Sequence, residues 1–215
     1  MFYALDQLDE KMLEYLDYDN GVFVEAGAND GISQSNTCFY EREKNWTGLL
    51  VEPNPIMFQR CKINRPKSFV ENYALVSENY EGNTIQGDFL DTNYDSLVSS
   101  VTDVGDWDNV YLSGRRNYIL NGDVNLITVE TITLTKLLDK HGITNIDFFS
   151  LDVEGYEISV LNGLDFSRFR PKYMLIETAN FSEIQEKIKE YMKEKNYKFI
   201  KKLSGNDDLF VDNLI

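Results

Sequence analysis

The chain has 215 residues, which is enough for one domain with a full hydrophobic core. Its 42% hydrophobic content and mean hydropathy of −0.38 are typical of a soluble globular protein and exclude a largely disordered chain. The formal net charge of −15 disfavours binding to nucleic acid, because phosphate recognition needs clustered Lys and Arg side chains.

The sequence also indicates where the protein works. No apolar run is long enough to span a bilayer, and the acidic N-terminal segment lacks the pattern of a signal peptide, so we expect a cytoplasmic protein without a membrane span. Two cysteines cannot form a disulfide framework for a chain of this size. We therefore interpret Cys38 and Cys61 as buried free thiols in a reducing compartment.

The first predicted elements are a helix and a strand. An amphipathic helix is predicted over residues 5–16, where five apolar residues share one helical stripe: Leu5, Leu8, Met12, Leu13 and Leu16. After turn residues at 18–21, the consecutive apolar residues 22–24 predict a central strand covered on both faces. The strand runs into Gly27 and Gly31, which permit a tight turn close to a ligand, and then into a helix predicted over residues 33–42.

The glycine turn has the pattern E-x-G-x-x-x-G in place of the G-x-G-x-x-G of dinucleotide-binding proteins. Glu25 and Asp30 would repel a diphosphate, so a cationic ligand is favoured. The next predicted strand, residues 49–51, ends in Glu52, at a spacing from the turn close to that of the acid that binds a ribose in doubly wound folds. S-adenosylmethionine fits, since it has an ammonium, a sulfonium and a ribose but no phosphate.

Polar residues next to the glycines are further candidates for binding this ligand. Asn29 lies within the turn, and Ser33 and Ser35 follow at the predicted helix N-terminus. The two serines are placed to bind the methionine carboxylate, although plain capping of the helix by Ser33 explains that residue equally well.

Three motifs in this order resemble those of the FkbM-type methyltransferases: residues 25–37 (EAGANDGISQSNT), 46–54 (WTGLLVEPN) and 151–157 (LDVEGYE). The resemblance implies the α/β, Rossmann-like class I methyltransferase fold, in which a doubly wound, mostly parallel seven-stranded sheet has an antiparallel C-terminal hairpin. It also implies an S-adenosylmethionine-dependent O-methyltransferase, commonly acting on sugar or polyketide hydroxyls.

Residues 68–76 predict a third strand. In the resembling family the end of this strand lies beside the adenine, so Asn72, Tyr73 and Ala74 are candidates to line its pocket. The residues from about 77 to 123 lack a helical stripe, and we interpret them as a substrate-recognition lid inserted into a single domain of residues 1–215.

This insertion carries aromatic and basic residues suited to an acceptor. Trp107, Tyr111 and Tyr118 are candidates to stack on a sugar ring, and Arg115 and Arg116 to hold an anionic group. The alternative is that the aromatic residues form a small core of the insertion and that the arginines are solvated.

The second half of the chain is expected to complete the sheet. Strands are predicted over residues 128–132, 146–151 and 173–177, helices over 134–141 and from 182, and a terminal hairpin over 197–211. Two of these strands deliver Asp152 and Glu177 to the edge of a parallel sheet where ligands bind.

Asp152, Glu154 and Glu177 are the candidate catalytic residues, because methyl transfer to an alcohol needs a group that takes up the hydroxyl proton. In one interpretation Asp152 or Glu154 is the general base, and Asp152 also contacts the ammonium of the donor. In the other, Asp152 and Glu177, with Asn180, hold Mg²⁺ or Mn²⁺ through oxygen ligands.

The function expected from these patterns is S-adenosylmethionine-dependent O-methylation of a sugar hydroxyl on a glycan or nucleotide sugar, for example a deoxyhexose such as rhamnose. The chain is also compatible with a domain of a larger glycan-building protein, and its oligomeric state stays open. The alternatives are an NAD-type oxidoreductase, disfavoured by Glu25, and a non-catalytic module that binds the cofactor.

Overall fold

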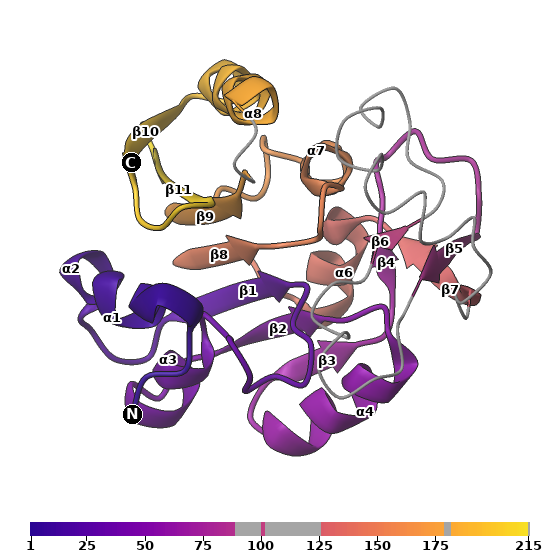
Figure 1. Ribbon diagram of the computed structural model, residues 1–215, viewed down its shortest axis with the longest axis horizontal. Coiled ribbons are helices and arrows are strands. Elements are labelled where there is room, and N and C mark those ends of the chain that lie inside the picture. The colour runs from indigo at the N-terminus through magenta and orange to yellow at the C-terminus, as the bar shows by residue number, and fades with distance from the viewer. Residues whose placement is uncertain (89–99, 102–125, 179–181, 215) are drawn as a thin grey trace.

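The computed structural model describes residues 1–88, 100–101, 126–178 and 182–214, and within them the strands form two sheets. The larger sheet has seven strands in the order β10-β11-β9-β8-β1-β2-β3. Figure 1 shows them stacked from the yellow C-terminal hairpin at the top to the magenta β3 below. This arrangement confirms the predicted Rossmann-like, doubly wound α/β fold.

The centre of the large sheet is parallel. Strand β1 (Val22–Ala26) lies between β2 (Thr47–Val51) and β8 (Phe148–Leu151), and β3 (Phe69–Glu71) and β9 (Tyr173–Glu177) extend the sheet on either side. These strands are short apolar runs because helices cover both faces of the sheet.

Alternate residues of each central strand belong to two different cores. Phe23, Leu50 and Phe148 contribute to the core under the N-terminal helices, and Val24 and Phe149 contribute to the core on the opposite face. Because neighbouring side chains of a strand point to opposite faces, one apolar run fills both cores.

The helices that cover the two faces come from different parts of the chain. The first core receives residues of α1 (Leu8–Lys11), α2 (Leu13–Leu16), α3 (Cys38–Glu43) and α4 (Pro55–Asn64). The second receives residues of α6 (Leu134–His141), α7 (Glu157–Asn162) and α8 (Ser182–Glu194). Cys38 of α3 and Cys61 of α4 are buried free thiols, as expected.

The C-terminal hairpin is antiparallel, which confirms that prediction. Strand β10 (Tyr197–Lys202) pairs with β11 (Asp207–Asp212), and β11 inserts between β10 and β9. Leu209 and Phe210 of β11 are fully buried, one in each core. The last strand is therefore an interior strand of the sheet.

The N-terminal helix predicted over residues 5–16 is broken into short pieces. Asp6 and Gln7 have positive φ angles of 50° and 58°, so the 3-10 turn η1 (Leu5–Gln7) does not continue into α1. Leu8 and Met12 of the predicted stripe are buried, but Leu5 is 56% exposed. The periodicity therefore identified the buried face correctly and the helix length incorrectly.

The single strand predicted over residues 68–76 is two separate strands, because the chain leaves the large sheet after Glu71. Strand β3 pairs with β2, whereas β4 (Ala74–Leu75) pairs with β7 (Leu126–Ile132) in a second sheet. At the break, the Asn72 side chain donates hydrogen bonds to the carbonyls of Glu52 and Pro53, both at 2.8 Å. These bonds hold the turn between the two sheets.

The second sheet has the strand order β4-β7-β5-β6 and contains the two described strands of the predicted insertion, β5 (Thr84–Asp88) and β6 (Ser100–Val101). The rest of the predicted lid, residues 89–99 and 102–125, lies outside the described residues. So do its candidate acceptor-binding residues, Trp107, Tyr111, Arg115, Arg116 and Tyr118.

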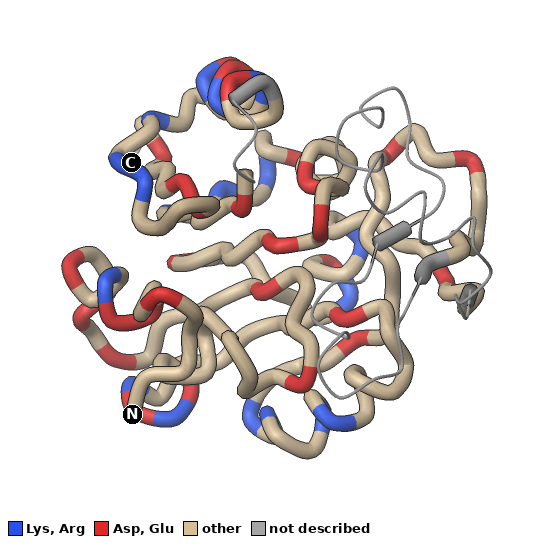
Figure 2. The backbone as a smooth tube through the Cα atoms, in the orientation of Figure 1, with Lys and Arg blue, Asp and Glu red and all other residues tan. Residues whose placement is uncertain are grey.

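In the described parts of the chain, every helix is too short or too polar to cross a bilayer. Figure 2 shows charged residues over most of the elements, with mixed charges along α8. Acidic segments also mark the ends of the central strands that face the second sheet. That edge carries the candidate site.

Candidate functional site

A cavity opens at the carboxyl ends of β1, β2 and β8 and contains about 990 Å³ of space, its open mouth included. Its walls come from the glycine turn, the ends of these strands and the β3–β4 connection; they include Gly27, Asn29, Glu52, Ala74 and Asp152. The order of the strands reverses about β1, and ligands of open parallel sheets bind at such a reversal.

Gly27 allows the turn after β1 to pack against the end of β8. Its φ angle is +83°, and a Cβ atom built on it would lie 1.7 Å from the carbonyl oxygen of Asp152. No other residue fits that contact without displacing the backbone. Gly27 therefore holds the end of β1 against the end of β8, and it is one of the residues that line the cavity.

Gly31 has a different role from the one expected. Its φ angle is +78°, and a Cβ atom would lie 2.7 Å from Cγ of Arg65 and 2.8 Å from Sγ of Cys61. Gly31 is not among the residues that line the cavity. The close approach that this glycine permits is to helix α4, not to a ligand.

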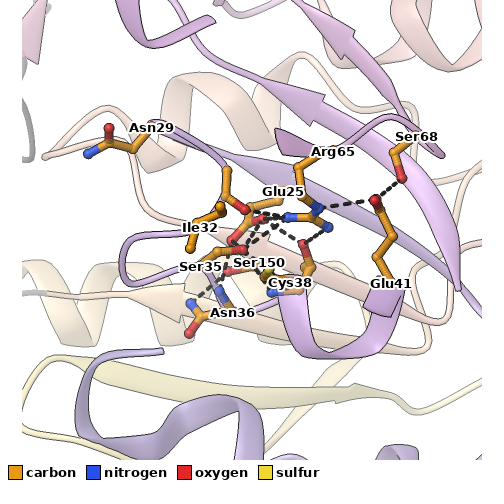
Figure 3. Close-up of polar contacts among 12 residues, drawn as sticks. Glu25, Asn29, Ile32, Ser35, Asn36, Cys38, Glu41, Arg65, Ser68 and Ser150 are labelled. Atoms are coloured by element: carbon orange, nitrogen blue, oxygen red, sulfur yellow. Dashed lines mark hydrogen bonds and ion pairs between the residues drawn. The ribbon is translucent and has the colours of Figure 1, made fainter. Parts of the chain in front are cut away.

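Glu25 lines the cavity, but its carboxylate already has partners within the protein (Figure 3). It accepts hydrogen bonds from Oγ of Ser35 at 2.9 Å, the backbone N–H of Asn36 at 2.9 Å and Oγ1 of Thr37 at 2.5 Å. Nη1 of Arg65 lies 3.5 Å from the carboxylate. The negative charge that we expected to select a cationic ligand is therefore neutralised internally.

The helix predicted from residue 33 begins only at Cys38, because residues 27–37 form a loop. Ser35 ends this loop by accepting a hydrogen bond from the backbone N–H of Cys38 at 3.1 Å. Asp30 accepts from the backbone N–H groups of Ile32 and Ser33 at 2.8 and 2.7 Å, and it does not line the cavity. Asp30 thus stabilises the loop, whereas Ser33 and Ser35 line the cavity.

Glu52 lies where the sequence predicts it, at the end of β2 and in the cavity wall. It accepts hydrogen bonds from the backbone N–H of Asn29 at 2.7 Å and of Asn54 at 2.8 Å. Burial raises its pKa from 4.5 to about 7, although these two bonds oppose the shift. Each carboxylate oxygen retains a second lone pair that is able to accept from a ligand hydroxyl.

Of the residues predicted to surround the adenine, Tyr73 and Ala74 line the cavity and Asn72 does not. Asn72 instead holds the turn between the sheets, as described above. The cavity wall in this part of the chain begins after the turn and includes both residues of β4, Ala74 and Leu75.

Asp152 and Glu154 line the cavity, and the carboxyl group of Glu177 lies beside Asp152 on the neighbouring strand end. The carboxyl groups of Asp152 and Glu177 are close enough to interact, so the two groups titrate together. Asp152 is solvent-exposed by surface area, but protein atoms surround it on several sides, and the resulting desolvation raises its pKa. Desolvation and the charge of Asp152 also raise the pKa of Glu177.

The turn that presents these acids is held by Glu157 at the start of α7. Its carboxylate accepts hydrogen bonds from the backbone N–H of Val153 at 3.2 Å and of Gly155 at 3.0 Å. Glu154 has a left-handed φ angle of 58°, an uncommon conformation that persists where surrounding contacts enforce it. Glu157 is therefore a structural acid at a helix start, as its position in the sequence indicates.

A profile of the FkbM methyltransferase domain matches residues 25–199 of this sequence. The chain belongs to the FkbM methyltransferase domain family. The match covers the glycine turn, the cavity-lining strand ends and all three motifs that carry the resemblance.

Two solved methyltransferase structures are similar to this FkbM domain. The methyltransferase FkbM from Methylobacillus flagellatus KT superposes with a TM-score of 0.55 at 15% sequence identity, over 90% of this chain and 44% of that protein. The chain thus spans less than half the length of that relative. A SAM dependent methyltransferase from Aquifex aeolicus matches at 9% identity over 94% of this chain and 87% of its own, with a TM-score of 0.47. No curated protein matches the sequence.

The described residues of the FkbM domain do not support the expected Mg²⁺ or Mn²⁺ site. Among them, no three His, Cys, Asp or Glu side chains are grouped so that they could hold a metal ion. Asp152 and Glu177 lie together, but the third candidate ligand, Asn180, lies outside the described residues.

Three polar residues near the site were missed in the sequence. Asn36 lines the cavity and donates to Oγ of Ser150 at 2.9 Å, while its own Oδ1 is buried without a partner in the described structure. Asp207 pairs with Glu177 across β11 and β9, and burial raises its pKa to about 6. Arg65 is fully buried behind Glu25. No local pattern marks these residues, because their partners are distant in the chain.

Proposed function

We propose that this FkbM domain binds S-adenosylmethionine in the cavity and catalyses transfer of its methyl group to a hydroxyl oxygen. The observation that carries the proposal is the charge of the cavity wall. Among the described lining residues none is Lys, Arg or His, and three acids line the cavity besides the internally paired Glu25: Glu52, Asp152 and Glu154. Such a wall suits a ligand with an ammonium and a sulfonium, and it opposes the diphosphate of NAD.

The donor is proposed to lie across the ends of three strands. Glu52 is placed to accept hydrogen bonds from the ribose hydroxyls, next to Tyr73 and Ala74, which would flank the adenine. The turn at Gly27 would then receive the methionine part. Asp152 lies on the β8 side of that turn, where its carboxylate suits the ammonium.

The reaction requires the protein to orient an alcohol and to accept its proton. The bound donor supplies an electrophilic methyl group: the acceptor oxygen forms the new O–C bond while the C–S bond electrons return to sulfur. Holding the two reactants in line provides much of the acceleration. The released hydroxyl proton needs a nearby base, because an alcohol is a weak nucleophile at neutral pH.

Asp152 and Glu154 are the proposed proton acceptors, since both line the cavity. The raised pKa of Asp152 makes its ionised form a stronger base than an ordinary carboxylate. Glu177 is proposed to share a proton with Asp152 and so to adjust its basicity. The substitution Asp152→Asn separates two roles. If Asp152 binds the ammonium, the substitution will raise the donor KM; if Asp152 is the base, it will lower kcat.

The proposed acceptor is a carbohydrate hydroxyl, for which a deoxyhexose such as rhamnose is the first compound to test. This step is supported by the family resemblance alone. A panel of free sugars, nucleotide sugars and glycans, assayed with labelled donor, tests it. The same panel run with EDTA, Mg²⁺ or Mn²⁺ tests the metal, and activity that EDTA leaves unchanged would exclude a metal requirement.

Calorimetric titration of the protein with S-adenosylmethionine, S-adenosylhomocysteine and NAD tests the binding step. We expect both sulfur compounds to bind one molecule per chain and NAD to give no heat of binding. Binding of NAD alone would overturn the proposal in favour of an oxidoreductase. Binding without turnover on any acceptor would favour a non-catalytic module.

Two matched acidic substitutions test the position of the donor. Glu52→Gln removes a charged hydrogen-bond acceptor from the cavity wall and should weaken S-adenosylhomocysteine binding about tenfold or more. Asp139→Asn changes an exposed acid of α6 that pairs with Arg168 and does not line the cavity, so its effect should be within about twofold. Equal effects of the two substitutions would contradict the proposed placement.

A further inference from the structure

Arg65 is a fully buried cation directly behind the cavity loop. It follows helix α4, and its side chain is 0% exposed. Figure 3 shows its guanidinium at the centre of a polar cluster, between Glu25 and Ser35 on one side and Glu41 and Ser68 on the other. Arg65 itself is not among the residues that line the cavity.

The guanidinium binds the loop of residues 27–37 at three points. Nη1 donates to the carbonyl oxygen of Gly31 at 3.0 Å and to Oγ of Ser35 at 3.1 Å, and Nη2 donates to Oγ1 of Thr37 at 2.9 Å. Nε donates to Glu41 on α3 at 3.1 Å. Four hydrogen bonds in fixed directions from one planar group are a geometry that lysine cannot reproduce.

The same cluster contains two buried acids. Glu25 and Glu41 are 4% and 2% exposed, and Nη1 and Nε of Arg65 lie 3.5 and 3.1 Å from their carboxylates. Removal of one partner from a buried ion pair leaves an uncompensated charge. Without Arg65, two carboxylates would stand unpaired beneath the loop.

Glu25 transmits this constraint to the cavity. Its carboxylate receives the hydroxyl of Ser35 and the backbone N–H of Asn36, and the Asn36 side chain in turn donates to Ser150 of β8 at 2.9 Å. Ser35, Asn36 and Ser150 all line the cavity. The network therefore joins α4, the loop and two central strands along the wall opposite Glu52.

We propose that Arg65 is a positioning residue, which holds the 27–37 loop through Glu25 in the shape that binds the methionine part of the donor. The inference rests on the proposed function, because it assigns that part of the ligand to the loop. It predicts that Arg65 sets the affinity for the donor and contributes little to the chemical step.

The test compares Arg65→Met with Arg170→Met. Arg170 is a partly buried arginine with Nε 2.7 Å and Nη2 2.5 Å from Asp212, but it lies at the terminal hairpin and does not line the cavity. Both substitutions remove an arginine that is ion-paired with a buried carboxylate, so both should lower the melting temperature. Only Arg65→Met should change the binding of the donor.

We expect Arg65→Met to raise the donor KM and the S-adenosylhomocysteine Kd at least tenfold, with kcat within about threefold of the wild type and the acceptor KM unchanged. Arg170→Met should leave all four constants within about twofold. Arg65→Lys keeps the charge but not the fork of donors, so its donor KM should lie between those of the wild type and Arg65→Met.

A second measurement does not depend on the ligand. Hydrogen exchange of the backbone amides of residues 28–38 should be faster in Arg65→Met, or in Arg65→Lys if the methionine variant does not fold, than in Arg170→Met. The double variant Glu25→Gln/Arg65→Met should recover part of the lost protection, because the unpaired charge of Glu25 is absent.

The outcomes separate the two proposals. Unchanged loop exchange and unchanged donor affinity in folded Arg65 variants would overturn the positioning role, and so would an equal rise in donor KM in Arg170→Met. If the loop loses protection but the wild type binds neither S-adenosylmethionine nor S-adenosylhomocysteine, the proposed function fails, and with it the assignment of the loop to a donor.

Discussion

At the scale of single residues, the site contains acids whose pKa values are raised by burial. Burial raises the pKa of Glu52 and of Glu157 from 4.5 to about 7, and desolvation also raises the pKa of Asp152. A carboxyl group with a raised pKa in the folded state binds protons more tightly there than in the unfolded state. These acids therefore lower the stability of the free protein as the pH rises, which is the opposite of a carboxylate in a salt bridge.

The free energy of unfolding of the free protein is expected to fall between pH 4.5 and about 7. Below this window Glu52 and Glu157 are protonated in both states, and above it they are ionised in both. Glu157→Gln should flatten the profile, which urea denaturation at a series of pH values would measure. A profile that rises through this window, with no difference between the wild type and the variant, would contradict the raised pKa values.

Donor binding should show the reverse dependence on pH. In the proposed complex the ionised form of Glu52 would accept hydrogen bonds from both ribose hydroxyls, so the affinity for S-adenosylhomocysteine should increase from pH 5 to pH 8, through the pKa of about 7. Calorimetry of the wild type and Glu52→Gln would measure this. The variant should lose most of the increase, and an unchanged slope would place the ribose elsewhere.

At the scale of elements, two glycines with left-handed φ angles serve different purposes. Gly27 has φ +83° in the turn where β1 meets β8, and a Cβ atom would lie 1.7 Å from the carbonyl oxygen of Asp152. Gly142 has φ +64° as the C-cap of α6, and no atom lies within 4 Å of the position of a Cβ. The first glycine is required by both conformation and packing, and the second by conformation alone.

Gly142→Ala should cost about 1–2 kcal/mol, the usual strain of a left-handed residue that has a Cβ atom. Gly27→Ala should cost about 4 kcal/mol or more and abolish donor binding, because the strand ends must move apart. Chemical denaturation and calorimetry of the two variants would measure these effects. Similar costs would show that the β1 turn is able to adjust around the new methyl group.

At the scale of the whole molecule, the C-terminal residues complete the sheet that carries the site. Strand β11 lies between β9 and β10, and it buries Leu209 and Phe210 in the cores on opposite faces. Its neighbour β9 ends in Glu177, whose carboxyl group lies beside Asp152. The hairpin therefore supports the cavity from a distance.

Deletion of residues 197–215 should give an insoluble or aggregated protein, since it removes two strands and leaves β9 as an exposed apolar edge. Deletion of residues 213–215 alone keeps both strands and should leave a soluble protein that still binds the donor. Size-exclusion chromatography and circular dichroism would compare the two. A soluble, folded product of the longer deletion would show that the hairpin is dispensable.

The sequence by itself determined the elements whose causes are local. Apolar runs predicted the central strands, the helix predicted over residues 134–141 is α6, and the E-x-G-x-x-x-G turn located the cavity between β1 and β8. The acid at the end of β2 was also found, because the spacing from a glycine turn to that strand end is a property of the fold.

Only the tertiary structure decided which of the acids have partners within the protein. Glu25 and Asp30 have the same charge and lie in the same turn, but one is neutralised by Arg65 and the other bonds to its own loop. The tertiary structure also decided that residues 68–76 divide between two sheets, at the turn held by Asn72. These outcomes depend on partners that packing brings together from distant positions, and hydrophobic periodicity carries no information about such pairs.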